Sequence, residues 1–92
     1  MKIIVVQTAT FQRQIKKLYK NQKQDLDTAI YEILKNTNIG EMKKGDLAGV
    51  QVHKFFMINQ LTLLAYEFFE NQLQLHLLML GSHENFYRDL KR

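Results

Sequence analysis

The chain has 92 residues, of which 46% are hydrophobic and 24% are charged. This composition is typical of one globular domain and excludes a disordered chain. The absence of cysteine excludes disulfides and thiolate chemistry and fits a reducing compartment. The four consecutive apolar residues at 3–6 are too few for a signal peptide, and no apolar run could span a membrane, so we expect a cytoplasmic protein.

The charge balance is basic: 13 Lys and Arg against 9 Asp and Glu give a net charge of +4 and a pI near 9.4. Such a balance favours anionic partners, namely nucleic acid, the ribosome or an acidic protein. Many small soluble domains carry a similar charge only for solubility. Charge alone therefore leaves both interpretations open.

The first half of the chain predicts a strand followed by a helical hairpin. Residues 3–6 are all β-branched, which favours a strand, and Thr8 or Thr10 can cap the helix that follows. Residues 21–23 break the helical pattern and predict a tight connection to a second helix. The apolar positions with helical spacing are Phe11, Ile15, Leu18 and Tyr19 in the first helix, and Leu26, Ala29, Ile30, Ile33 and Leu34 in the second.

The second half predicts three strands after a long irregular stretch at residues 36–49. From Val50 the apolar period switches to two, with strands at 50–55, 61–69 and 73–80 joined by turns short enough for antiparallel hairpins. The last strand is apolar on both faces, which favours a central place in the sheet. Its expected faces are Leu73, Leu75, Leu77 and Met79 on one side, with Leu78 and Leu80 on the other.

Gly81 and Ser82 are expected to end this last strand, and Ser82 can cap a short C-terminal helix with His83 in its first turn. The predicted fold is therefore α+β, a single domain over residues 1–92 in the order β-α-α-β-β-β-α. The helical hairpin should cover one face of the antiparallel three-stranded meander, because each has an apolar face to bury.

This element order, together with specific residues, resembles the RelE/ParE superfamily of toxins from bacterial type II toxin–antitoxin modules. The residues that carry the resemblance are Phe11, Lys16-Lys17-Leu18, the stretch 44–49 (Lys-Gly-Asp-Leu-Ala-Gly), the stretch 63–66 (Leu-Leu-Ala-Tyr) and the closing stretch 80–91. Gly81-Ser82-His83, with Tyr87 four residues beyond the histidine, is similar to the YafQ-type branch, whose members are messenger-RNA endonucleases.

The resemblance implies two kinds of target. RelE-like members cut messenger RNA, often on the ribosome, whereas ParE-like members poison DNA gyrase and cut nothing. In both, a cognate antitoxin protein neutralises the toxin. We therefore expect an mRNA endoribonuclease that inhibits translation, with a gyrase inhibitor or a non-cleaving antitoxin-binding module as the alternatives.

His83 is the best candidate for a catalytic residue. Cleavage by the 2′-OH of RNA requires one proton to be removed from that hydroxyl and another to be given to the 5′ leaving oxygen. Imidazole titrates near pH 6.5 and can do either. The resemblance also implies a functional histidine here, although a residue that only caps or packs the last turn would look the same. Tyr87 could stack on a base or hold a phosphate, while Phe86 and Leu90 are the expected core residues.

Cations are needed where charge builds on the phosphate oxygens. Arg88 and Lys54 complete the expected catalytic set with His83 and Tyr87. Lys54 shares the parity of Val50 and Val52, so it either emerges at the strand end or is turned by a bulge. The expected RNA-binding residues are Lys43, Lys44, His53, Lys91 and Arg92, although each lysine could instead serve only solubility.

The sequence gives little support for RelE-type strand arginines, for a metal or cofactor site, or for a hydrolase triad. The strands at 61–69 and 73–80 hold no Arg or Lys, unlike the arginine-bearing strands of RelE, so the resemblance carries over no strand arginine. His76 is expected to be a hydrogen-bonded histidine of the sheet. The three histidines lie far apart with no cysteine, so we expect neither a metal nor another cofactor. Ser82, the only serine, stands next to His83, which is poor geometry for a hydrolase triad.

Overall fold

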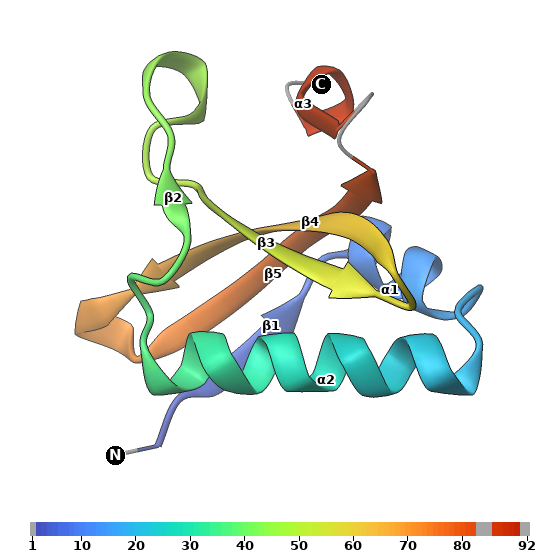
Figure 1. Cartoon of the computed structure of the whole chain (residues 1–92). Coiled ribbons are helices and arrows are strands. Elements are labelled where there is room, and N and C mark those ends of the chain that lie inside the picture. The colour runs from blue at the N-terminus through green and yellow to red at the C-terminus, as the bar shows by residue number, and fades with distance from the viewer. Residues whose placement is uncertain (1, 83–85, 91–92) are drawn as a thin grey trace.

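A computed structural model describes residues 2–82 and 86–90 and contains a five-stranded sheet with helices on both sides (Figure 1). The helices are α1 (Ala9–Ile15), α2 (Lys20–Lys35) and α3 (Phe86–Leu90). The strands are β1 (Ile4–Gln7), β2 (Glu41–Met42), β3 (Gln51–Met57), β4 (Gln60–Phe69) and β5 (Gln74–Ser82). Two short 3-10 helices, η1 (Gly45–Leu47) and η2 (Glu70–Gln72), complete the chain.

The sheet order is β1-β5-β4-β3-β2, with β1 parallel to β5 and every other pair antiparallel. The predicted α+β fold is confirmed, and β5 is an interior strand, paired on both sides with β1 and β4, although β4 takes the central place. The strand β2 was not predicted. Its two residues, Glu41 and Met42, are too few to show an alternating apolar pattern in the sequence. They form a strand only because they pair with Val52 and Gln51 of β3.

The two faces of the sheet are covered differently (Figure 1). Helices α1 and α2 pack on one face, here called the helix side, where Phe11, Leu26 and Ile33 meet Leu64 and Leu75 in the larger core cluster. The opposite face, here called the open side, carries α3 and η1 over a smaller cluster of Val50, Val52, Leu63, Ala65, Met79 and Phe86. No helix of the described part is long and apolar enough to cross a membrane.

The helical hairpin differs from the prediction at its connection. Residues 21–23 lie inside α2, which begins at Lys20, and the connection is residues 16–19 instead. The reason is local: the backbone N–H of Tyr19 donates to Oε1 of Gln22 at 2.8 Å, a contact of the capping-box type that starts a helix. Thr8 is the cap of α1, because its Oγ1 accepts from the Phe11 N–H at 3.1 Å.

The faces of β5 also differ from the expected alternation. Ala65 of β4 pairs with Met79 and Tyr66 pairs with Leu77, so the register shifts by one residue and Leu78 is left out of the pairing. A bulge of this kind exchanges the two faces of a strand. Consequently Leu75, Leu77 and Leu80 contribute to the core on the helix side, while Met79 joins the cluster on the open side.

Candidate functional site

The irregular stretch between α2 and β3 is fixed to the sheet by Tyr66. The Tyr66 side chain is fully buried in β4, and its hydroxyl accepts from the Gly40 N–H at 2.9 Å. The same hydroxyl lies 2.9 Å from the Thr37 carbonyl and 3.0 Å from Oε1 of Gln51, the acceptors for its proton. Burial raises the pKa of Tyr66, so the hydroxyl stays protonated. This anchoring, together with the pairing of β2 with β3 and a hydrogen bond from the Lys43 N–H to the Val50 carbonyl at 2.8 Å, fixes the backbone at Lys43.

Lys43 and Tyr87, two of the predicted site residues, are in direct contact on the open side. The Lys43 Nζ lies 4.7 Å from the centroid of the Tyr87 ring, which is a cation–π distance. The same Nζ is 3.2 Å from Oε2 of Glu41. The ring of Phe86 meets that of Tyr87 edge to face, with centroids 5.3 Å apart. A lysine from the irregular stretch thus holds the C-terminal helix α3.

The surroundings of Lys43 favour its charged form. A side-chain hydrogen bond with Tyr87 raises the pKa of Lys43 above its ordinary 10.5; burial opposes this shift, and the contact with Glu41 adds to it. Lys43 is therefore a cation throughout the physiological range. It offers an anionic ligand a charge that is already positioned beside an aromatic ring.

We expect Lys43→Met to lower the free energy of unfolding by about 0.5–1 kcal/mol, because a cation over an aromatic ring contributes that much at an accessible site. Lys44→Met is the matched control, since the neighbouring Lys44 is exposed. Because the folded-state pKa of Lys43 is raised, the difference should be present below pH 10.5 and be lost as pH rises through the raised value. Urea denaturation of both variants measures this, and equal midpoints for the two would contradict it.

Lys54 lies on the same open side as α3. The pairing of β3 with β4 is continuous from Gln51 to Met57, so Lys54 keeps the parity of Val52 and is not turned by a bulge. Nor is it at the strand end: it is exposed in mid-strand because α3 covers only part of this face. Lys54 pairs with Leu63, and Leu63 pairs with Gly81, which puts Lys54 and Gly81 at one level of the sheet, about 10 Å apart.

Gly81 marks the point where α3 meets β5. A Cβ at Gly81 would lie 2.8 Å from Cδ1 of Phe86, so only glycine lets the Phe86 ring approach β5 this closely. Phe86 is buried and Leu90 packs against the same cluster, as the sequence predicted, although Tyr87 packs there in part as well. The helix α3 and Lys54 thus lie on the same open side of the sheet.

The remaining predicted site residues show no hydrogen bond or ion pair with Lys43 or Lys54, or lie outside the described part of the chain. Arg88 is on α3 and exposed, with its Nε 3.8 Å from Oδ1 of the adjacent Asp89. Lys44 is exposed directly before η1. His83, Lys91 and Arg92 lie outside the described residues.

The remaining two histidines are not brought together with these residues. His53 is on the helix side, where its Nε2 is 3.7 Å from Oε1 of Glu32 and its ring is stacked 6.1 Å from that of Phe55. His76 occupies β5, as predicted for a hydrogen-bonded histidine of the sheet. Its Nε2 is 2.9 Å from Oε1 of Gln74, and the Phe69 ring meets it edge on.

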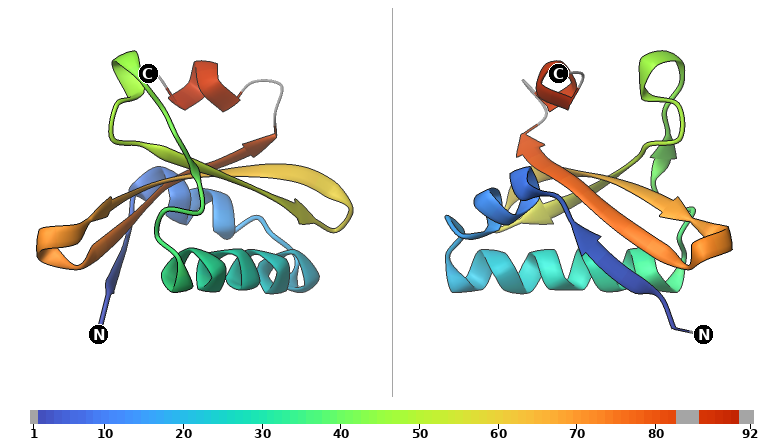
Figure 2. Two further views of the ribbon diagram at one scale, coloured as in Figure 1. Left: turned by 60° about the vertical axis from the view of Figure 1, so that its left-hand side comes forward. Right: turned by 180° about the vertical axis from the view of Figure 1, so that it is seen from behind.

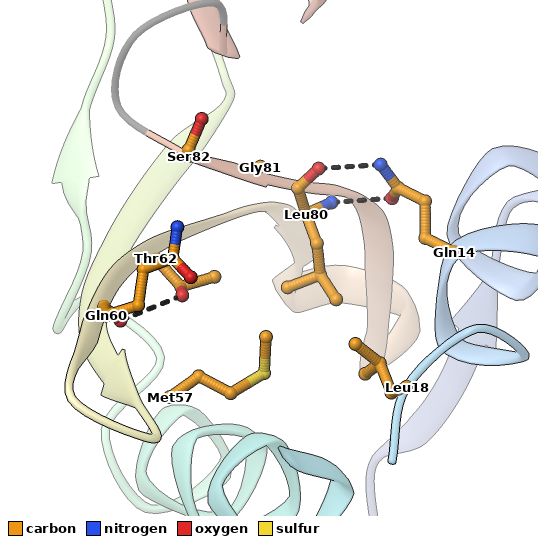
Figure 3. Close-up of a pocket in the computed structure, with 8 residues that line it drawn as sticks. All are labelled: Gln14, Leu18, Met57, Gln60, Thr62, Leu80, Gly81 and Ser82. Carbon is orange, nitrogen blue, oxygen red and sulfur yellow. Dashed lines mark hydrogen bonds between the residues drawn. The ribbon is translucent and has the colours of Figure 1, made fainter.

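A pocket of about 150 Å³ lies on the helix side, near the end of β5. Leu18, Met57 and Leu80 point toward its centre, and the Gln14 amide makes two hydrogen bonds with the backbone of Leu80 (Figure 3). None of the described candidates lines this pocket. Within the described ranges, no three His, Asp or Glu side chains cluster in a way that could hold a metal ion.

Two structural residues of the site were missed by sequence analysis. Tyr66 was noted only as part of a motif, although a tyrosine in an otherwise apolar strand requires a partner for its hydroxyl. Gln14 was not considered at all. Its amide satisfies both backbone groups of Leu80 beyond the end of β1, which fixes the course of β5 toward α3.

The fold is shared with solved toxin structures. A chain of the Escherichia coli RelBE toxin–antitoxin complex aligns with a TM-score of 0.73 at 14% identity, covering 90% of this chain and 99% of that chain. A mutant of E. coli toxin RelE in the free state gives 0.75 at 14% identity, covering 98% and 90%. The RelBE2 toxin–antitoxin complex of Mycobacterium tuberculosis gives 0.61 at 17% identity, covering 88% and 91%. No curated protein sequence matches the chain.

The fold is accordingly that of the RelE toxins. A family model described as "ParE-like toxin of type II bacterial toxin-antitoxin system" matches residues 5–91. The chain therefore belongs to this ParE-like family of the RelE/ParE superfamily and is a type II toxin. The similarity to the YafQ-type branch, which rests on Gly81, Ser82 and His83, stays a prediction.

Proposed function

We propose that this toxin is an mRNA endoribonuclease that inhibits translation by metal-independent acid–base cleavage in the cytoplasm. The observation that supports the proposal best is the contact of Lys43 with Tyr87 on the open side, which presents a fixed cation beside an aromatic ring. Single-stranded RNA offers the matching chemistry, a phosphate joined to a base that can stack.

In this proposal His83 is the general acid or base. In the sequence it follows Ser82, the last residue of β5, and two residues separate it from Phe86, where α3 begins, so it is four positions before Tyr87. Tyr87, Arg88 and Lys54 position the substrate, and Lys43, Lys44, Lys91 and Arg92 bind the RNA backbone. His53 finds no support as an RNA ligand, because its side chain is on the helix side next to Glu32.

The partner of the toxin, in the same proposal, is a cognate antitoxin protein that neutralises it, and the RNA is bound free or on the ribosome. The support for an antitoxin is the family description, together with similar toxin chains solved in complexes named for toxin and antitoxin. Exposed apolar side chains such as Ile4 and Met42 give an antitoxin surface to cover.

A second function, inhibition of DNA gyrase without cleavage, is favoured by a different observation. The strands β4 and β5 carry no Arg or Lys, so the centre of the sheet offers no cation to a phosphate. The family model is also named for ParE. In that case Lys43, Tyr87 and Lys54 would belong to a protein-binding surface.

The two functions are separated by one paired experiment. Purified toxin is added to a cell-free translation extract, where the length of a defined messenger RNA is followed, and in parallel to a gyrase supercoiling assay. We expect the messenger to be cut and supercoiling to proceed. Intact messenger with blocked supercoiling would reject the endoribonuclease and establish the gyrase inhibitor.

A further inference from the structure

The tip of the β3–β4 hairpin presents an aromatic ring that the core does not use. Phe56 is 68% exposed on the open side, and Leu61, its cross-strand partner in β4, is 37% exposed. Ile58 in the adjoining turn is exposed as well. Single exposed apolar residues are ordinary, but a contiguous group on one face marks a binding surface.

This hairpin tip is held in place from the helix side. Ile58 and Asn59 form the two-residue turn, with φ of +48° and +65°, values that match the twist of the flanking strands. Oδ2 of Asp25, from α2, accepts a hydrogen bond from the Ile58 N–H at 2.8 Å. The backbone that carries Phe56 is thus fixed by strand pairing and by Asp25. Little conformational entropy of the hairpin is therefore lost when Phe56 binds a ligand.

The charge around Phe56 selects the kind of ligand. Lys54 stands two residues earlier on the same face, about 6.6 Å along the strand. Residues 50–66 include no Asp or Glu, and Lys54 is the only Lys or Arg among them. An exposed ring beside a cation, with no acid nearby in the strands, is the combination that binds single-stranded nucleic acid by stacking a base and pairing with its phosphate.

We propose that Phe56 is a stacking platform for one base of the single-stranded RNA, with Lys54 at the adjoining phosphate and Leu61 extending the apolar surface. The proposal rests on the proposed function and deepens it by naming a second contact point for the RNA, away from α3. Figure 2 (left view) shows that the ribbon of α3 lies apart from the tip of the β3–β4 hairpin. The RNA would then pass from α3 across β4 to the hairpin.

Binding can be measured without cleavage. The chain holds no tryptophan, so Phe56→Trp introduces a single tryptophan at the platform, whose fluorescence can be excited selectively over that of the four tyrosines. We expect its fluorescence to be quenched on titration with a single-stranded oligonucleotide whose 2′ positions are methylated to prevent cleavage. The same sequence as a duplex should quench it far less. Tyr31→Trp is the control, since Tyr31 is 61% exposed on α2, on the other side of the sheet.

Loss of the ring should weaken binding. We expect Phe56→Ala to raise the KM for RNA cleavage about 10-fold with little change in kcat, as expected for the loss of one base–aromatic stack. Phe56→Tyr should restore most of the affinity, whereas Phe56→Leu, which keeps an apolar side chain without a ring, should not. Circular dichroism of each variant checks the fold.

The outcomes separate the platform from the proposed function. Quenching of Phe56→Trp by single-stranded oligonucleotide without any RNA cleavage would retain the platform and reject the endoribonuclease. Cleavage with an unchanged KM in Phe56→Ala, or equal quenching of the Tyr31→Trp control, overturns the platform alone. A response of Phe56→Trp to the cognate antitoxin and none to RNA assigns the surface to a protein partner and also overturns it.

Discussion

His83→Ala should lower the rate of messenger-RNA cleavage by about 10²-fold or more, since a positioned general acid or base contributes about that factor. The loss should appear in kcat and leave KM nearly unchanged, because the proton transfer occurs in the transition state and not on binding. Steady-state or single-turnover cleavage of a short RNA measures both quantities. Circular dichroism of the variant checks that the fold is retained.

His76→Ala is the matched control for this result. His76 lies on β5 and its ring contacts Gln74 and Phe69, with no described candidate residue beside it. We expect its replacement to leave cleavage unchanged. Similar losses of cleavage from the two variants, or full cleavage activity of His83→Ala, would remove His83 from the mechanism.

Phe86→Ala should have the largest effect on stability, lowering the free energy of unfolding by about 3–5 kcal/mol. Phe86 is 1% exposed, and its ring fills the space between α3 and the open side of the sheet. A helix of five residues has no stability of its own, so α3 depends on this anchor. Because Tyr87 and Arg88 are carried on α3, cleavage should fall together with stability.

Phe56→Ala is the matched control for stability, since it removes the same ring from an exposed position. An exposed substitution of this kind changes the free energy of unfolding by no more than about 0.5 kcal/mol. Urea denaturation of both variants and the wild type provides the comparison. Equal midpoints for Phe86→Ala and Phe56→Ala would show that α3 is not held by Phe86.

The order of the main elements could be predicted from the sequence because each has a strong local pattern. The β-branched residues 3–6, the helical spacing from Phe11 and the period of two after Val50 depend only on neighbours in the chain. The misplaced features depend on other segments. The bulge at Leu78 results from pairing with β4, and β2 exists only through pairing with β3.

In the candidate site, too, features that depend on local sequence were predicted, and features that depend on contacts with distant segments were not. That Phe86 packs inward followed from sequence, because only one of two adjacent aromatics can face fully inward, although Tyr87 also packs against the cluster in part. The contact of Lys43 with Tyr87 did not follow, since it depends on Tyr66 anchoring the chain at Thr37 and Gly40. The exposure of Lys54 depends on how far α3 extends over the sheet, which parity along one strand cannot predict.

The central claim is that this toxin cleaves RNA by acid–base chemistry in which the 2′-OH of the RNA is the nucleophile. Attack of that oxygen on the adjacent phosphorus expels the 5′ oxygen and leaves a 2′,3′-cyclic phosphate on one product and a 5′-hydroxyl on the other. The most direct measurement is the mass of the products of a defined RNA incubated with the toxin under two conditions: as free RNA in EDTA, and bound to intact ribosomes in Mg²⁺. We predict cyclic-phosphate and 5′-hydroxyl ends. Intact RNA under both conditions, or products with 5′-phosphate ends, would contradict the account.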